Sequence, residues 1–277
     1  MTSHTVRDYY DQIGEEEWKR LEQDPYHQLE LLTNLHFMEK YLPEGGTILD
    51  AGGGPGRYTI FLAKKGFKVV ILDISAVQLD IARQKVTEAG IPFDKVDYIE
   101  RSLPNISLFA DNHFDAVICF GPLSHLLEER DRKLAARELV RVAKPGAPLF
   151  VSVINRFAVF RTVLQRYDLH EDLVDPHHKR MFDEGLHLAH PSKDGSGFTD
   201  AYFYTPDELK SSFEEQGTEI LAIAGCEGLA AHLQEPLTKL AEDETIWKAW
   251  MDLHWRTCTE PSILGTAEHL LMICRKI

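Results

Sequence analysis

The stretch Ile48-Leu49-Asp50-Ala51-Gly52-Gly53-Gly54-Pro55-Gly56 decides the fold of this chain, because an apolar run stops at a carboxylate and then turns through four glycines. A strand that runs into such a turn exposes backbone N–H groups to a ligand at the start of a helix. The dinucleotide fingerprint Gly-x-Gly-x-x-Gly is one use of this arrangement, but here Arg57 stands where its third glycine belongs. We therefore rank an NAD oxidoreductase last among the possible functions.

The alternate spacing Asp50-x-Gly52-x-Gly54-x-Gly56 instead resembles the first motif of the class I S-adenosylmethionine (SAM)-dependent methyltransferases. The resemblance covers about residues 45–154 and 201–277. It implies that Asp50 orders the loop and the methionine amine side of SAM. It also implies that Gly52, Gly54 and Gly56 admit the cofactor.

The segment after the loop predicts a second strand that ends in a carboxylate. Residues 58–65 read as a helix closed by Gly66, and residues 68–73 form a nearly all-apolar strand ending at Asp73. Asp73 follows Gly56 by 17 positions (73 − 56), close to the roughly 20 expected for an acid that accepts hydrogen bonds from ribose hydroxyls. The alternative role, a helix cap, is given to Ser75 with Gln78 as its capping-box partner, which leaves Asp73 free for the ligand.

The whole chain predicts an α/β fold with a parallel sheet and helices on both faces. Further helices are expected over 76–89, 128–143 and 206–216, the last with Thr205 as its cap. The expected strands are 47–50, 68–73, 96–99, 115–120, 148–154, 218–224 and 269–275. The resemblance implies the seven-stranded, mostly parallel, Rossmann-like methyltransferase sheet, whose final strand inserts antiparallel. We place no crossover-length helix between the last two strands.

Two segments outside this alternation are expected to be helical. Residues 1–44 form an N-terminal segment in which Tyr9-Tyr10-Asp11 resembles the short aromatic sequence that folds over the cofactor in several methyltransferase families. The resemblance makes Tyr10 a cofactor-binding residue of a lid, with passive packing on the sheet as the alternative. Residues 155–200 are too long for an ordinary connection and predict an inserted helical cap over the acceptor. The core then comprises 45–154 and 201–277.

The cap segment holds five histidines, His170, His177, His178, His187 and His190. Their spacing does not place a metal-ligand set on one helix face, so no metal is expected. Histidines that face solvent or substrate are the preferred interpretation, because neutral imidazoles in a roof are able to orient or deprotonate an acceptor near pH 7.

The family comparison assigns further residues along the carboxyl edge of the sheet. It implies that Ile74 lies against adenine and that Ser102 and Leu103 take the place of the usual acidic adenine contact, since Glu100-Arg101-Ser102-Leu103 displaces that acid. It also places Phe120, at the end of the fourth strand, beside the cofactor.

His125 is the one catalytic residue that we predict. It follows the fourth strand at the sheet edge where ligands collect in open α/β folds. A general base for a hydroxyl or thiol acceptor is one interpretation, and a histidine that packs under the next helix is the other. A base is unnecessary for a neutral amine or a thiolate, because the sulfonium of SAM is already activated.

Composition narrows the possible partners. The formal net charge of −14 argues against nucleic-acid binding, which depends on clustered Lys and Arg. The four cysteines are too far apart for a Cys-x-x-Cys pair and are expected to be small core residues of a cytoplasmic protein. The N-terminus shows no signal-type apolar core, and no run approaches the roughly 18 apolar residues of a membrane span.

The function that fits these features is methyl transfer from SAM to the O, N or S atom of a small molecule, without nucleic acid or membrane as partner. Two alternatives stay open. A protein or RNA methyltransferase shares these motifs but needs an open acceptor face, and a non-catalytic SAM-binding protein keeps the loop without an acceptor pocket. The acceptor and the oligomeric state are left open.

Overall fold

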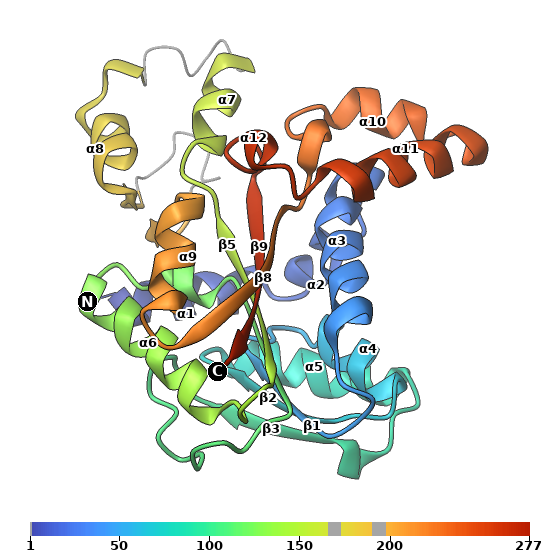
Figure 1. The fold of residues 1–277 in the computed structure, drawn as a ribbon, viewed down its shortest axis with the longest axis vertical. Helices are drawn as coiled ribbons and strands as arrows, with labels where there is room; N and C mark the ends of the chain where they lie inside the picture. The colour runs from blue at the N-terminus through green and yellow to red at the C-terminus, as the bar shows by residue number, and fades with distance from the viewer. Residues whose placement is uncertain (1, 166–172, 190–197) are drawn as a thin grey trace.

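The computed structural model describes residues 2–165, 173–189 and 198–277, and the fold is a seven-stranded α/β sheet with helices on both faces (Figure 1). The strands are β1 (Thr47–Ala51), β2 (Lys68–Asp73), β3 (Val96–Glu100), β4 (Ala116–Phe120), β5 (Pro148–Ile154), β8 (Thr218–Gly225) and β9 (His269–Lys276). Their order across the sheet is β3-β2-β1-β4-β5-β9-β8. The predicted Rossmann-like methyltransferase sheet is confirmed.

The last strand, β9, is antiparallel to both of its neighbours, β5 and β8, while the pairs among β1 to β5 are parallel. The register pairs Ile154, at the carboxyl end of β5, with His269, at the start of β9. The beginning of β9 therefore shares one edge of the sheet with the carboxyl ends of β1, β4, β5 and β8. This is the edge where ligands bind in open α/β folds.

Two layers of helices cover the sheet because successive strand residues point to opposite faces. One face buries Ile48 and Val69 against α3 and α4, and the other buries Leu49 and Val70 with residues of α6 and α9. The helices of these layers are α3 (Pro25–Tyr41), α4 (Arg57–Lys64), α5 (Ala76–Glu88), α6 (Glu129–Val142) and α9 (Pro206–Glu214). The four cysteines are buried and free, as expected for core residues.

Local signals explain where several of these helices start and stop. The side chain of Thr205 accepts a hydrogen bond from the backbone N–H of Glu208, and the Glu208 carboxylate accepts one from the backbone N–H of Thr205, so the predicted capping box of α9 is present. Gly66 follows α4 with a φ of 97°, a conformation that favours glycine.

The connection between β8 and β9 differs from the expectation. It holds α10 (Gln234–Leu240), α11 (Glu244–Thr257) and α12 (Pro261–Leu264), after a short 3₁₀ turn η4 (Gly228–Ala230). Asp243 caps α11 through its side chain, and Met251 and Leu237 are buried against Leu29 of α3. The prediction that no crossover-length helix lies between these strands was wrong. Helix α11 is long enough, but α10 and α11 pack on α3 and not on the sheet.

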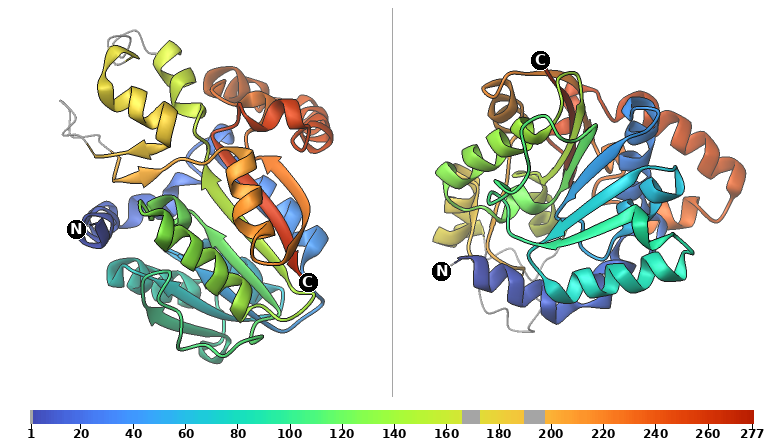
Figure 2. Two further views of the ribbon diagram at one scale, coloured as in Figure 1. Left: turned by 60° about the vertical axis from the view of Figure 1, so that its left-hand side comes forward. Right: turned by 90° about the horizontal axis from the view of Figure 1, so that it is seen from below.

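The N-terminal segment is helical and packs along the cofactor edge. It forms α1 (Thr2–Ile13) and α2 (Glu15–Arg20) before α3. Gln78 of α5 donates its side-chain amide to the carbonyl oxygens of Tyr10 (2.8 Å) and Gly14 (3.0 Å). Figure 2 shows α1, in dark blue, beside α5.

The described part of the 155–200 segment follows β5 beyond its carboxyl end. It comprises α7 (Ala158–Gln165), α8 (Pro176–Glu184) and β6 (Leu186–His187), which pairs with β7 (Ala201–Tyr202). Elsewhere among the described residues, two further 3₁₀ turns are η1 (Phe93–Lys95) and η2 (Pro122–His125). Figure 1 shows α7 and α8 at the same end of the molecule as α12.

Candidate active site

The glycine loop begins at Asp50, which links β1 to the helix that follows. The Asp50 side chain is buried and accepts a hydrogen bond from the hydroxyl of Thr59 on α4 (2.7 Å). Burial raises the pKa of Asp50 to about 6. This contact joins the end of β1 to α4, the two elements that the loop connects, and the role of Asp50 in ordering the loop stays a prediction.

The amide groups of the loop are directed differently from the expectation. The N–H groups of Gly52 and Gly53 donate to the carbonyl oxygen of Leu72 (2.6 and 3.2 Å), and the N–H of Gly54 donates to a carboxylate oxygen of Asp73 (2.9 Å). The prediction that these amides face a ligand is wrong for the loop as described, because its turns aim them back at β2. The loop instead fastens the carboxyl ends of β1 and β2 together.

The loop needs glycine for two reasons: a side chain on Gly52 would clash, and Gly54 adopts a positive φ. Gly52 has a φ of 78°, and a Cβ on it would lie 1.9 Å from Cγ of Pro122. Gly54 has a φ of 51°, and a Cβ on it would meet no atom within 4 Å. Gly56 caps α4 with a φ of 85° and packs against Ala82. Gly54 is thus the loop position whose missing side chain leaves open space.

Asp73 lies at the carboxyl end of β2 with both carboxylate oxygens engaged by the backbone. One oxygen accepts from Gly54 N and the other from Ser75 N (both 2.9 Å), so the carboxylate is not free as predicted. Burial raises its pKa to about 6. Each carboxylate oxygen has a second lone pair, so these contacts leave capacity for ribose hydroxyls.

The capping box predicted for α5 is only half formed. The hydroxyl of Ser75 accepts from the N–H of Gln78 (3.0 Å), as a cap should. The Gln78 side chain, however, turns away to Tyr10 and Gly14 on the N-terminal helices. A residue assigned to local capping therefore attaches the N-terminal helices to α5.

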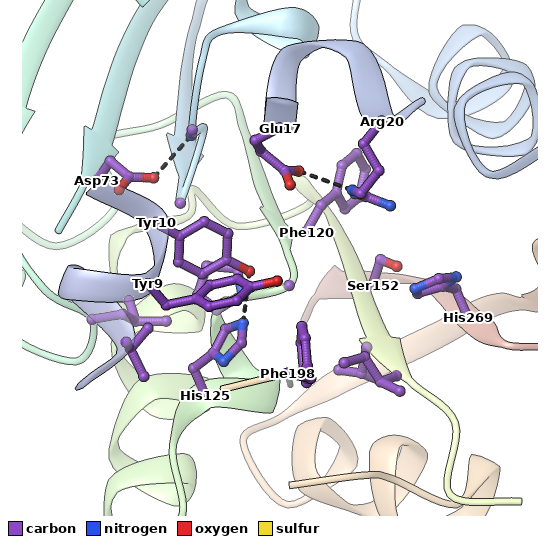
Figure 3. A pocket seen from close by; sticks show the side chains of 18 of the residues that line it. Tyr9, Tyr10, Glu17, Arg20, Asp73, Phe120, His125, Ser152, Phe198 and His269 are labelled. Carbon is purple, nitrogen blue, oxygen red and sulfur yellow. Dashed lines mark hydrogen bonds and ion pairs between the residues drawn. The ribbon is translucent and has the colours of Figure 1, made fainter. Parts of the chain in front are cut away.

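One cavity of about 900 Å³ lies at this edge, and it is lined by the predicted site residues with one exception. Gly56 is the exception, because it packs against α5. The lining residues that were predicted are Tyr10, Asp50, Gly52, Gly54, Asp73, Ile74, Ser102, Leu103, Phe120 and His125. Figure 3 shows Asp73 at one end of the labelled group and His269 at the other, with Tyr10, Phe120 and His125 between them.

Tyr10 of α1 and His125, the predicted catalytic residue, meet inside this cavity. The Tyr10 hydroxyl lies 2.9 Å from Nε2 of His125 (Figure 3). Nδ1 of His125 lies 3.3 Å from the carbonyl oxygen of Asp200. A carbonyl only accepts, so Nδ1 carries the proton and Nε2 accepts from Tyr10. Burial lowers the pKa of His125 to about 4 and raises the pKa of Tyr10, so both groups are neutral at pH 7.

The cap contributes one wall of the cavity. Val159 and Thr162 of α7 line it, together with His187 and Phe198. The His177 and His187 rings are in contact, with Nε2 to Nδ1 at 3.2 Å, and His187 also stacks on Phe203. Burial lowers the pKa of His187 to about 4. Of the five histidines of the cap, His170 and His190 lie outside the described residues, and His178 lies off the cavity wall.

A charged cluster at the far end of the cavity was missed by the sequence analysis. It joins Glu30 of α3, Glu227 after β8 and His269 of β9, whose side-chain oxygens and nitrogen lie within 4.8 Å of one another. His269 Nδ1 is 2.8 Å from Glu227 and 3.7 Å from Glu30, and Arg20 donates to Glu30 at 2.7 Å. The two carboxylates thus already have two cationic partners, Arg20 and His269, so their charge requires no metal ion.

No local spacing in the sequence announces this cluster. Its members come from three distant elements, and the only signal is topological: β9 starts at the edge where β8 ends.

Among the described residues, no helix is both long and apolar enough to span a membrane.

The cluster predicts a pH-dependent stability. Burial alone would lower the pKa of His269, but the carboxylates of Glu30 and Glu227 raise it to about 9. A folded-state pKa above the unfolded value of about 6.5 stabilises the fold below pH 6.5, and this contribution is lost as the pH rises through 9. The Tm should therefore fall between pH 6.5 and 9.5 by more in the wild type than in His269→Gln, measured by circular dichroism. Parallel Tm curves would contradict the ion pair.

Comparison with known proteins agrees with this geometry. The family pattern of a methyltransferase domain matches residues 48–146. The chain is 33% identical over 132 residues to "Ubiquinone biosynthesis O-methyltransferase" of Hahella chejuensis, covering 48% of this chain and 53% of that protein. The chain thus spans about half the length of the curated relatives that it matches.

Solved structures share the fold over most of the chain. A SAM-dependent methyltransferase of Methanosarcina mazei superposes with a TM-score of 0.60 at 22% identity, covering 87% of this chain and 97% of that one. The magnesium protoporphyrin IX methyltransferase of Synechocystis PCC 6803, solved with bound S-adenosylhomocysteine (SAH), gives 0.60 at 18% identity with full coverage of both chains. Motif, sheet order and matched domain agree: residues 48–146 match a methyltransferase domain, and the chain has the fold of the solved SAM-dependent methyltransferases.

Proposed function

We propose that this chain transfers the methyl group of SAM to a small molecule held inside the cavity. The observation that carries the proposal is that the cofactor residues and the cap line one cavity of about 900 Å³. Small-molecule sites typically occupy about 300–1,000 Å³, so the space suits a cofactor with a small acceptor.

The residues present fit the cofactor. Asp73 has carboxylate lone pairs for ribose hydroxyls, and Gly54 leaves open space for close approach. Ile74, Ser102 and Leu103 line the cavity and are the residues that we expect to contact adenine. When bound, SAM supplies a methyl group already activated on a sulfonium. The tasks of the chain are to align the acceptor in line with that methyl group and to exclude water.

The acidic character of the chain and its roof favour a small acceptor over a macromolecule. The net charge of −14 disfavours RNA, and the α7 residues Val159 and Thr162 cover the cavity where a protein acceptor needs an open face. The named activity of the Hahella chejuensis relative, an O-methyltransferase, is consistent with an oxygen acceptor.

His125 as a general base stays a prediction. In the closed arrangement its Nε2 holds the Tyr10 hydroxyl, so an acceptor reaches this nitrogen only by replacing Tyr10. The contact also gives His125 a second role that we propose here, to hold the lid closed over SAM.

Methyl transfer from labelled SAM into separated cell fractions tests the proposal. The purified chain is incubated with SAM labelled in its methyl group and with small-metabolite, RNA and protein fractions of a cell extract. Label should enter the small-metabolite fraction. Label confined to RNA or protein would establish a macromolecular acceptor, and SAM binding without any transfer would establish a non-catalytic binding protein.

A further inference from the structure

His232 is a buried histidine on the cavity wall that the sequence analysis did not single out. Its side chain is 3% exposed, and it adopts the left-handed backbone conformation with a φ of 63°. Its Nε2 is buried without a hydrogen-bond partner among the residues that the structure describes. A strained backbone and an unpaired imidazole nitrogen both cost stability, and such features concentrate at functional sites.

The other ring nitrogen of His232 faces a carboxylate. Nδ1 lies 3.3 Å from Oε1 of Glu268 and 3.4 Å from the hydroxyl of Thr162. The negative charge of Glu268 favours a proton on Nδ1, and the Thr162 hydroxyl then accepts the hydrogen bond from that nitrogen. Nε2 then carries the lone pair.

Tyr26 fixes both members of this pair. Its hydroxyl donates to the Glu268 carboxylate and accepts from the backbone N–H of His232 (2.8 Å). One residue of α3 thus holds the carboxylate and the strained histidine at a set distance. A carboxylate that orients an imidazole and leaves its other nitrogen as the acceptor is a general-base arrangement.

The pair lies on the part of the cavity wall that α7 of the cap contacts. Both residues line it, and Glu268 immediately precedes β9 at the edge that holds the glycine loop. Helix α7 of the cap covers the pair, because Thr162 contacts the ring and the Gln165 side chain donates to the His232 carbonyl. Nε2 itself is buried in this arrangement, so an acceptor reaches it only after the side chains around it move away.

We infer that Glu268 and His232 form a dyad whose Nε2 takes the proton from a hydroxyl group of the acceptor during methyl transfer. The acceptor O–H bond breaks, the oxygen bonds the methyl carbon, and the carbon–sulfur bond of SAM breaks to leave SAH. The proton stays on His232, where Glu268 stabilises the imidazolium. The inference rests on the proposed function and specifies its substrate class as a hydroxyl compound.

The charged surroundings are consistent with a base at neutral pH. Burial lowers the pKa of His232, Glu268 and Glu227 oppose that shift, and Arg161 adds to it, with a net lowering. The imidazole is therefore neutral at pH 7.5. His125, by contrast, has both ring nitrogens engaged while the lid is closed.

Rates on two acceptors that differ in ionisation test the dyad. Catechol is largely protonated at pH 7.5, whereas 4-nitrocatechol is largely ionised and needs no base. SAH release is measured for wild type, His232→Gln, Glu268→Gln, His125→Gln and the exposed control His113→Gln. His232→Gln should lower the catechol rate by about 10²–10⁴ and the 4-nitrocatechol rate by less than about tenfold.

The other variants separate base from positioning. Glu268→Gln should show the same selectivity in weaker form, His125→Gln should lower both rates alike, and His113→Gln should change neither. Equal losses on both acceptors in His232→Gln, or the selective loss appearing in His125→Gln instead, would overturn the inference.

A measurement without an acceptor completes the test. Nitrogen NMR of the imidazoles, with the His232 signals identified by their absence in His232→Gln, should show a neutral ring protonated on Nδ1 at pH 7.5. A proton on Nε2 would overturn the dyad even if the wild type methylates neither catechol. Calorimetry with SAM tests the proposed function separately from the dyad. Absence of SAM binding would contradict the proposed function, whereas the proton position measured by NMR would still decide for or against the dyad.

Discussion

Replacing Gly54 with valine should weaken SAM binding by about a hundredfold or more, a loss of about 2.7 kcal/mol. Gly54 lines the cavity, and its missing side chain leaves open space, so a valine side chain there would occupy the volume that the cofactor approaches. The measurement is the Kd for SAM by isothermal titration calorimetry.

Asp73→Ala should also weaken SAM binding, but by removing hydrogen bonds and not by obstructing the cofactor. It removes charge-assisted hydrogen bonds to ribose worth about 1.5–3 kcal/mol, which corresponds to roughly tenfold to a hundredfold in Kd. Unchanged affinity in both Gly54→Val and Asp73→Ala would contradict the assignment of the cofactor site.

Gly66→Val is the matched control. Gly66 also has a positive φ, 97°, and a Cβ on it also meets no atom within 4 Å, but it lies after α4 and away from the cavity wall. It carries the same kind of backbone strain without the obstruction. We expect a lower Tm with an unchanged Kd for SAM.

Replacing most of the cap with a short linker should abolish methyl transfer and leave SAM binding within a few-fold of wild type. The deletion covers residues 158–199 and keeps Asn155 and Arg156, whose contacts hold the core together. The Asn155 side-chain amide donates to the carbonyl oxygens of Leu264 and Ala267, and Arg156 forms an ion pair with Glu208. The ends are close, since Asn155 and Tyr204 form a β-bridge.

The expected loss follows from which residues the cap supplies. It provides an acceptor wall, including Val159 and Thr162, while the predicted cofactor residues lie outside it. Val174→Ser, at a cap side chain that is 87% exposed, should leave both measurements unchanged. Methylation with unchanged specificity by the folded, shortened chain would show that the cap does not select the acceptor.

The sequence was most informative where local chemistry and topology coincide. Buried strands and the Asp50 to Gly56 loop predict the sheet and its ligand edge, because a parallel strand that ends in a carboxylate and glycines has few alternatives. The predictions that were wrong depend on contacts between elements distant in the sequence or on the backbone of the loop. The Gln78 side chain donates to the N-terminal helix α1 and not to its own helix, and Asp73 accepts hydrogen bonds from the backbone N–H groups of Gly54 and Ser75.

The helices between β8 and β9 show a different kind of miss. Asp243 as a cap and the spacing of Trp247, Met251 and Trp255 indicate a helix, but this helix packs on α3 and is not a crossover on the sheet. The Glu268 and His232 pair had no such signal, because the two residues meet only after α10 to α12 fold back toward β9. Strain at His232 and an unpaired nitrogen are visible only in three dimensions.

Calorimetric titration of the wild-type chain with SAM, SAH and NAD, repeated with Asp73→Ala, tests the central claim most directly. SAM and SAH should both bind, Asp73→Ala should weaken both by a similar factor because they share the ribose, and NAD should give no binding heat. Binding of NAD without binding of SAM, or SAM affinity unaffected by Asp73→Ala, would contradict the account.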